Sequence, residues 1–410
     1  MNERHHQRLN QIFSDLADEI AVPPSRYREA KERYDAVGAW LDEADSELAP
    51  YKPIIYPQGS FAVGTAVRPL GSDEYDVDAV CLLQLSTAQV TQKKLKSLVG
   101  NRLKHPQSRY KNMIDPPEGS RRCWTIHYAE STKFHLDVLP AIPDDYRWLL
   151  DLGVPYELAE SAICITDSKT WDIDPNWPRS NPKGYAAWFK SQMQMRLDEA
   201  KYAHAKALLR GIDEAKYAHE MEIRAEVERI EDFDVQTPLQ QLIQILKRHR
   251  DLRYNGDDDK PISIIITTLA AQAYSNEANI GEAILNVVPR MRGQIGQRNG
   301  VFWVPNPVNP QENFADKWAE KQRKAQLFFE WLNDLEQEYR ELLTDTGFEK
   351  VSGYLVEAFG QRDGEAAMAK FASRASQGSA TTVVLTQRKS QEPTKSRIEP
   401  PSRPSRPWRP

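Results

Sequence analysis

Two aspartates separated by a single residue interrupt an apolar segment of the chain. Asp76 and Asp78 lie in the sequence YDVDAVCLLQL (75–85), whose alternating apolar residues predict a β-strand. Successive side chains on a strand alternate between its two faces, so both carboxylates should point the same way. Carboxylates are costly to bury unless they are paired, hydrogen-bonded or bound to a metal. The spacing therefore indicates a cation site, because two carboxylates on one face can share a metal ion or bridge two.

A third carboxylate is expected from Asp137, which interrupts the apolar sequence FHLDVLPAIP. A single acid in such a segment is typical of the surface side of an edge strand. Three acids on core strands instead favour a shared metal site. Mg²⁺ prefers oxygen ligands and completes its coordination with water and substrate phosphates. Two such ions a few ångströms apart can hold the attacking and leaving oxygens of an in-line phosphoryl displacement.

Gly59 and Ser60 precede the first aspartate by about fifteen residues and form a candidate phosphate-binding turn. A glycine lets the backbone approach a phosphate closely, and a serine hydroxyl can donate to a phosphate oxygen. Gly-Ser alone is more typical of an ordinary turn. The segment is not a Walker A loop, since no GKS or GKT follows.

The composition is that of a globular enzyme. A net charge of −5 argues against a dedicated duplex-DNA binder, because affinity for the phosphate backbone comes mostly from clustered Lys and Arg. Cys81, Cys123 and Cys164 show no CxxC spacing, so we expect buried free thiols in a reducing compartment. The N-terminal sequence lacks the apolar core of a signal peptide, and no segment approaches the roughly 18 apolar residues of a membrane span. We therefore expect a cytoplasmic monomer with no membrane partner.

The pattern of elements divides the chain into three parts. Residues 1–185 begin with two helices, the second of which Ser25 could cap, and continue with strands and a further helix, as in a mixed α/β lobe. Residues 186–370 are helical throughout. Residues 371–410 are rich in Ser, Pro and Arg, so they predict a disordered basic tail. The expected fold class is α/β, with a mixed sheet and helices in the first lobe and an all-helical second lobe.

The combination of Gly-Ser, Asp-x-Asp and a later single Asp resembles the polymerase-β-like nucleotidyltransferase superfamily. Within it, YPQGSFAVGTAVRP, EYDVDAV, FHLDVLPAIP, SNPKGYAAWF and NPVNPQENFADKW resemble the bacterial CD-NTases. These are cyclic oligonucleotide synthases of CBASS anti-phage systems, related to cyclic GMP-AMP synthase and oligoadenylate synthase. The resemblance covers roughly residues 5–345 and implies a bilobal fold with nucleotides bound between the lobes.

The resemblance also implies a role for each matching residue. Asp76 and Asp78 would bind two Mg²⁺ ions, for which Mn²⁺ could substitute. Asp137 would complete the metal site and help to deprotonate the acceptor ribose hydroxyl. The donor triphosphate would be contacted by the following residues: Gln58, Gly59, Ser60, Lys247 and Ser263.

Some neighbouring positions depart from the family pattern. Several relatives place a base-stacking aromatic residue where this chain has Val63 or Ile264, which leaves Tyr56 and Tyr254 as candidates for that role. Arg248 and Arg250 are interpreted as solvated neighbours of Lys247.

The function expected from the resemblance is the synthesis of a cyclic di- or trinucleotide second messenger from ribonucleoside triphosphates such as ATP or GTP. The messenger would activate an effector, and the C-terminal tail could engage CBASS regulatory or conjugating proteins. The alternatives are a linear oligoadenylate synthase, a template-independent terminal nucleotidyltransferase, or a protein that only binds nucleotide.

Overall fold

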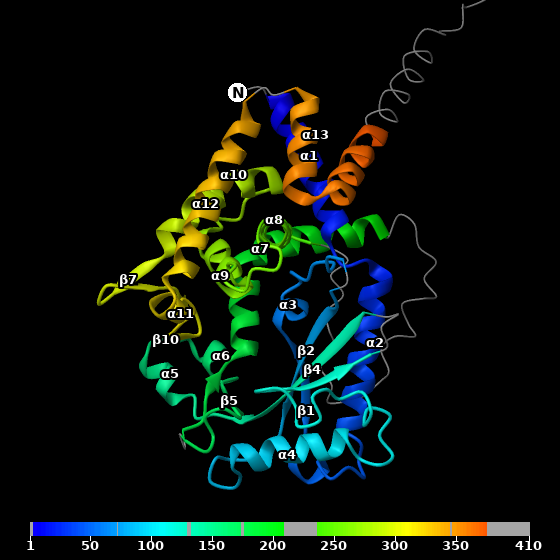
Figure 1. Ribbon diagram of the computed structural model, residues 1–410, viewed down its shortest axis with the longest axis vertical. Helices are drawn as coiled ribbons and strands as arrows, with labels where there is room; N and C mark the ends of the chain where they lie inside the picture. The colour runs from blue at the N-terminus through cyan, green and yellow to red at the C-terminus, as the bar shows by residue number, and fades with distance from the viewer. Residues whose placement is uncertain are drawn as a thin grey trace, which may run out of the picture.

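The computed structural model describes residues 3–71, 73–128, 133–173, 176–208, 236–344 and 347–374, with the side chains of α7 described up to residue 199. The chain forms a lower lobe built on a β-sheet and an upper lobe of helices (Figure 1). Residues 375–410 of the predicted tail lie outside this range, whereas residues 371–374, which were also predicted to be disordered, are helical. Among the described residues, no helix combines the length and apolar character needed to cross a membrane.

The lower lobe contains a mixed sheet in the order β1-β2-β4-β5-β6, with β3 paired to β4. β2 and β4 are parallel, whereas the other pairs are antiparallel. The strand bounds are β1 Ile54–Gln58, β2 Tyr75–Leu82, β3 Trp124–His127, β4 Phe134–Pro143, β5 Ile163–Ile165 and β6 Arg179–Ser180. The predicted strands are therefore present, and the fold class is confirmed.

The alternation in β2 gives the sheet two different faces. Val77, Ala79 and Cys81 are buried in a core shared with α2 and α4, while Asp76 and Asp78 project from the opposite face. The helix bounds are α2 Pro24–Leu41, α3 Gly59–Ala62, α4 Gln92–Leu103, α5 Arg147–Asp151 and α6 Tyr156–Ala159, with the 3₁₀ turn η1 at Ala49–Tyr51.

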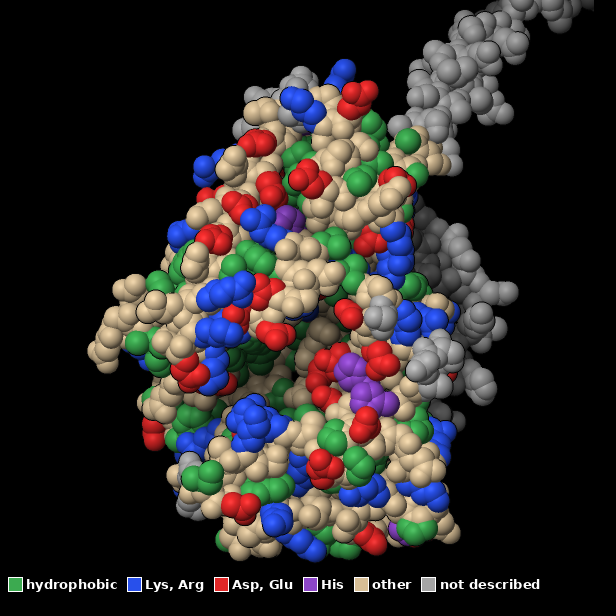
Figure 2. Space-filling view, in the orientation of Figure 1, with side chains coloured by type: hydrophobic (Ala, Val, Ile, Leu, Met, Phe, Trp, Pro, Cys, Tyr) green, Lys and Arg blue, Asp and Glu red, His purple; other side chains and the backbone are tan. Residues whose placement is uncertain are grey.

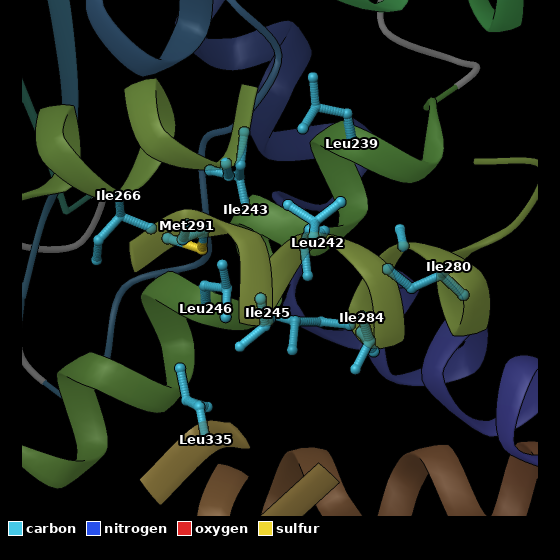
Figure 3. Packing of buried hydrophobic residues seen from close by; sticks show 14 of the residues in the cluster. Leu239, Leu242, Ile243, Ile245, Leu246, Ile266, Ile280, Ile284, Met291 and Leu335 are labelled. Carbon is cyan, nitrogen blue, oxygen red and sulfur yellow. The ribbon is translucent and has the colours of Figure 1, made fainter. Parts of the chain in front are cut away.

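The upper lobe is a helical bundle around one continuous hydrophobic core. Leu242, Leu246 and Ile284 are among the buried side chains that meet at its centre (Figure 3). The helix bounds are α1 Glu3–Ile20, α7 Pro182–Leu208, α8 Pro238–Arg253, α9 Ser263–Ala273, α10 Ile280–Met291, α11 Asp316–Glu320, α12 Gln322–Leu343 and α13 Phe348–Phe359, with the 3₁₀ turn η3 at Arg292–Gln294. A further helix continues through residues 361–374.

Three details differ from the expectations. Helix α1 shares the upper core, because Leu9, Ile12 and Phe13 pack among the helices of that lobe rather than against the sheet. Helix α2 begins after Pro23, with no side-chain cap, so the predicted Ser25 cap is wrong. The upper lobe also contains short strands: β7 Gly296–Arg298, β8 Val301–Trp303, β9 Pro305–Asn306 and β10 Asn309–Asn313. The division into lobes at about residue 185 stays a proposal, with α1 assigned to the helical lobe.

The three cysteines behave as free thiols. Cys81 and Cys164 are buried, as expected, while Cys123 is only partly so. Burial raises the pKa of Cys81 and of Cys164 to about 12, which leaves both protonated and unreactive near neutral pH.

Packing of α4 on the sheet can be tested at one glycine. A Cβ added at Gly100 would lie 2.0 Å from the Trp124 ring, whereas one at Gly353, in the exposed side of α13, would meet nothing within 4 Å. We expect Gly100→Ala to lower the free energy of unfolding by about 3 kcal/mol through overpacking. Gly353→Ala should raise it by about 0.5 kcal/mol through helix propensity. Denaturant unfolding of both variants measures the difference, and equal effects would contradict the packing described.

Candidate functional site

Three carboxylates converge where β2 and β4 run in parallel. The register pairs Asp78 with Asp137, and Asp76 precedes them on the same face of β2. One carboxylate oxygen from each residue lies within 4.8 Å of the others. The predicted triad is therefore brought together, and acidic side chains gather beside histidines along the hollow between the lobes (Figure 2).

The electrostatics of this cluster favour a cation. Burial, followed by the charges of Asp76 and Asp137, raises the pKa of Asp78 to about 7. Burial also raises the pKa of Asp137, whose Oδ1 accepts a hydrogen bond of 2.5 Å from Thr125 Oγ1. An all-oxygen donor set of this kind suits a hard divalent cation. The three carboxylates thus fit a divalent metal site.

His135 partly compensates this negative charge. Its Nε2 lies 3.1 Å from Asp76 Oδ1, and its Nδ1 lies 3.2 Å from Glu74 Oε2. The hydrogen bond to Asp76 raises the pKa of His135 to about 9. As an imidazolium it can orient the exposed Asp76 carboxylate.

Gly59 is required by the position of Asp78. Its φ is +65°, and a Cβ built on it would lie 2.3 Å from Asp78 Oδ2. Any other residue would therefore displace the carboxylate as well as strain the turn. Gln58 ends β1 directly opposite Asp78, and Ser60 follows in the short helix α3. The sequence YPQGS thus places a backbone turn against the metal site.

A cavity of about 680 Å³ lies between the lobes above the carboxylates. Its size is within the range of small-molecule sites. It is lined by most of the predicted residues: Gly59, Ser60, Asp76, Asp78, Lys247 and Ser263. Gln58 and Asp137 lie at the strands beneath it rather than on its lining. The predicted site residues from both lobes therefore face one space.

Helix α8 holds the loop that follows Ser60. Gln240 Nε2 donates to Val63 O, Gln244 Nε2 donates to Ala66 O, and Lys247 Nζ donates to Thr65 O at 2.9 Å and to Thr65 Oγ1 at 3.1 Å. These donors recur at helical spacing, so one face of α8 binds successive carbonyl groups of the loop. Lys247 therefore has a bracing role in addition to the phosphate contact expected for it.

The interpretation of Arg248 and Arg250 as solvated is wrong. Arg248 is 1% exposed and Arg250 is 6% exposed. Arg248 donates to Arg68 O and lies 3.3 Å from the carboxylate of Asp363, which also accepts from Arg68. Arg250 donates to Pro261 O and to Ser263 Oγ, so it fixes the start of α9. Both arginines line the cavity as buried, bonded groups.

The candidate base-stacking residues are not on the cavity. Tyr56 is 1% exposed and packs beneath Lys183, with Val80, on the same face of the sheet as the aspartates. Tyr254 donates its hydroxyl to Leu327 O. Val63 and Ile264 both line the cavity.

Several residues on the lining were missed by the sequence reasoning. They are Arg68, Tyr185, Asn306, Glu312 and Phe314. The sequence NPVNPQENF contains three of them, but nothing in its composition indicated a strand pair that turns them toward the cleft.

The three clustered carboxylates should destabilise the folded protein when no metal ion is bound. Asp78 has a higher pKa in the folded protein than the ordinary value, so its protonation favours folding and stability should fall as the pH rises through about 7. We expect Asp78→Asn to raise the free energy of unfolding at pH 8 by about 2 kcal/mol in the absence of metal.

The same variant should lose the stabilisation that a divalent cation gives to the native protein. Thermal unfolding with EDTA and with added Mg²⁺ measures both effects. Asp145→Asn, an exposed aspartate paired with Arg147, is the matched control. A metal-free Asp78→Asn protein less stable than the native one at pH 8 would contradict the proposed repulsion.

Comparison with known proteins agrees with the geometry. Residues 53–140 match the sequence model of the family "Cyclic GMP-AMP synthase DncV-like, nucleotidyltransferase domain". The chain is 30% identical over 355 residues to a c-di-GMP synthase of Roseivirga ehrenbergii, covering 86% of this chain and 84% of that protein. It is 25% identical over 366 residues to the cyclic dinucleotide synthase CdnG of Bradyrhizobium diazoefficiens, covering 86% and 81%.

Solved structures show the same fold. The B. diazoefficiens CD-NTase CdnG, in complex with GTP, superposes with a TM-score of 0.61 at 22% identity, over 88% of this chain and 97% of that one. CdnC of E. coli MS115-1, in a complex with HORMA-deltaN, gives a TM-score of 0.57 at 14% identity, over 88% and 99%. Since the sequence relationship at 30% identity extends over most of both proteins, the chain belongs to the CD-NTase family of nucleotidyltransferases.

Proposed function

We propose that this protein is a cyclic dinucleotide synthase that uses ribonucleoside triphosphates and Mg²⁺ and supplies a second messenger for bacterial anti-phage (CBASS) signalling. The observation that carries the proposal is the carboxylate triad facing a cavity that also contains Ser60, Lys247 and Ser263. The named curated relatives are cyclic dinucleotide synthases, which favours a dinucleotide product.

Each side of the cavity has its own role in this proposal. Asp76, Asp78 and Asp137 would hold two Mg²⁺ ions, or Mn²⁺ in their place, and these ions would supply charge stabilisation at the reacting phosphorus. Ser60 and Ser263 would donate to triphosphate oxygens, and Gln58 would support the turn beneath them. Asp137, oriented by Thr125, would accept the proton of the acceptor ribose hydroxyl. The second phosphodiester bond would close in the same cavity after the linear intermediate rebinds.

A tail-bound regulatory or conjugating protein, a messenger-activated effector and a cytoplasmic location stay predictions. Residues 375–410, which would form the docking tail, lie outside the described residues.

Product analysis tests the reaction. Incubation with all four ribonucleoside triphosphates and Mg²⁺, followed by phosphatase and mass spectrometry, should give a phosphatase-resistant cyclic dinucleotide. We expect Asp137→Asn to lower the rate by at least about a hundredfold, because it removes both a metal ligand and a proton acceptor. Asp145→Asn should leave the rate unchanged. Products with a free 3′ end that lengthen with time would instead identify a linear oligonucleotide synthase or terminal transferase.

Lys247 provides a test of triphosphate binding that does not depend on turnover. Burial, with a smaller contribution from Arg250, lowers the pKa of Lys247 to about 7, so the free protein holds it mostly neutral at pH 8. A triphosphate beside it would favour the ammonium form. Binding should therefore take up on the order of one proton at pH 8 and close to none from this group at pH 6.

Calorimetry in buffers of different ionisation enthalpy measures this uptake with a non-hydrolysable triphosphate. Lys247→Met should abolish the difference seen at pH 8, while Lys317→Met, on the exposed side of α11, should retain it. Equal proton uptake in the native and Lys247→Met proteins would contradict the phosphate contact.

A further inference from the structure

The cavity has a second polar region, away from the carboxylate triad. Glu312 in β10 and Asn306 in β9 line it together with Tyr185 of α7 and Phe314. β10 lies to the left of α7 and β2 lies to its right in Figure 1, so the two polar regions of the cavity come from different sides of α7. None of these groups has a role in the metal site or in the proposed phosphate contacts.

The Glu312 carboxylate is held on one side only. Asn306 Nδ2 donates to Glu312 Oε2 at 2.7 Å, and Asn306 Oδ1 in turn accepts from Val308 N at 3.0 Å. This second bond fixes the orientation of the amide, with its NH₂ group toward the glutamate. Among the described residues no other group donates to Glu312, so its remaining acceptor positions are available to a ligand. Burial raises the pKa of Glu312, while the hydrogen bond from Asn306 and the nearby charge of Arg122 oppose this rise.

Two aromatic side chains accompany this carboxylate. The rings of Tyr185 and Phe314 meet edge to face, with centroids 6.3 Å apart, and both are only partly buried. Tyr185 is anchored through its hydroxyl, which lies 2.9 Å from Thr268 Oγ1. A fixed aromatic surface beside a polar group can stack on a nucleobase while the polar group reads its edge.

Charge separates the groups of the cavity into two kinds. The cations on its lining are Arg68, Lys247, Arg248, Arg250 and Lys260. These cations, with the metal site, suit phosphates, whereas an ionised Glu312 would repel them. A nucleotide with its phosphates at Ser60 and Lys247 would therefore present an uncharged part to Glu312, either the base or the ribose.

The hydrogen-bonding pattern selects among the bases. A carboxylate is an acceptor only, and its two oxygens match two adjacent donors. Guanine presents N1–H and N2–H₂ side by side, next to the acceptor O6, whereas adenine and cytosine each present a ring-nitrogen acceptor beside one amino group. Uracil presents a single N–H between two carbonyl oxygens. The second hydrogen of Asn306 Nδ2 would suit guanine O6.

We propose that Glu312, held by Asn306 beside the Tyr185 and Phe314 rings, selects guanine for one of the nucleotides bound in the cavity. This inference rests on the proposed function, since it assumes that the cavity binds nucleoside triphosphates. It makes Glu312 a specificity-determining residue, and GTP at least one of the two substrates.

The variant Glu312→Gln tests the proposal in the full-length protein. Its amide oxygen can keep the bond from Asn306, which turns its NH₂ group toward the ligand and against guanine N1–H. The same NH₂ group suits adenine N1. We expect the Kd for α,β-methylene GTP, measured by calorimetry with Mg²⁺, to rise at least about tenfold. The Kd for α,β-methylene ATP should stay the same or fall.

Glu320→Gln is the matched control, because it makes the same chemical change on the exposed side of α11. It should leave the preference between the two nucleotides unchanged, and thermal unfolding should show that both variants are folded. A Glu312→Gln protein that retains the native preference for GTP would overturn the proposal. So would an equal loss of affinity for both nucleotides.

The native protein provides a second test, which needs no variant. The inosine analogue lacks the N2 amino group, so we expect it to bind about tenfold more weakly than the guanosine analogue. The 2′-deoxyguanosine analogue should bind like the guanosine one. Equal binding of inosine and guanosine analogues would overturn the proposal, and loss of binding on removal of the 2′-hydroxyl would assign Glu312 to the ribose.

These readouts separate this inference from the proposed function. Selective guanine binding without a cyclic product would leave Glu312 in its role and contradict the synthase. A cyclic product from a Glu312→Gln protein with unchanged base preference would support the synthase and contradict the role of Glu312.

Discussion

The repulsion among three carboxylates on neighbouring parallel strands is the constraint that shapes the lower lobe. The register of β2 and β4 sets Asp78 directly beside Asp137, so the site exists as soon as the two strands pair. The surroundings then support the charges from several directions. Thr125 bonds Asp137, His135 bonds Asp76, and Gly59 leaves room for the Asp78 carboxylate. Burial and the neighbouring charges of Asp76 and Asp137 raise the pKa of Asp78 to about 7, so a cation that joins the cluster would favour its ionised form.

The helical lobe lines the cleft and also positions a loop of the lower lobe. Its core is formed around α8, and the polar face of that helix bonds the carbonyl groups of the loop that follows Ser60. The C-terminal part of the chain reaches the same loop, because Asp363 binds both Arg68 and Arg248. Removing one partner of such a buried ion pair strongly destabilises the fold, because it leaves an uncompensated buried charge. The turn at Gly59 and Ser60 is therefore positioned by helices far from it in the sequence.

The predictable part of this site came from local periodicity. The alternation around Asp76 and Asp78 defines a strand face from a few residues, and the same reasoning applies to Asp137. The pairing of β2 with β4, which brings the acids together, is long-range. It was inferred from a third acid in a second apolar strand, and the resemblance to a family supported it. The strands β7 to β10 have no such alternation, and side-chain bonds, such as the one that Val304 N donates to Asn313 Oδ1, support their pairing. Glu312 was missed for that reason, and Arg248 because a basic helix face is more often solvated.

The two charged sides of the cavity depend on one another. Without ligand, the triad has raised pKa values for Asp78 and Asp137, while burial lowers the pKa of Lys247. The charged forms of these three side chains are therefore least favoured when the cavity is empty. In the proposed function, a metal ion would compensate the acidic side, and a triphosphate would favour the ammonium form of Lys247 and would also bind the metal. Because the metal and the triphosphate would also bind each other, their binding free energies should be coupled favourably. This coupling would favour binding of the metal–nucleotide complex over binding of either component by itself.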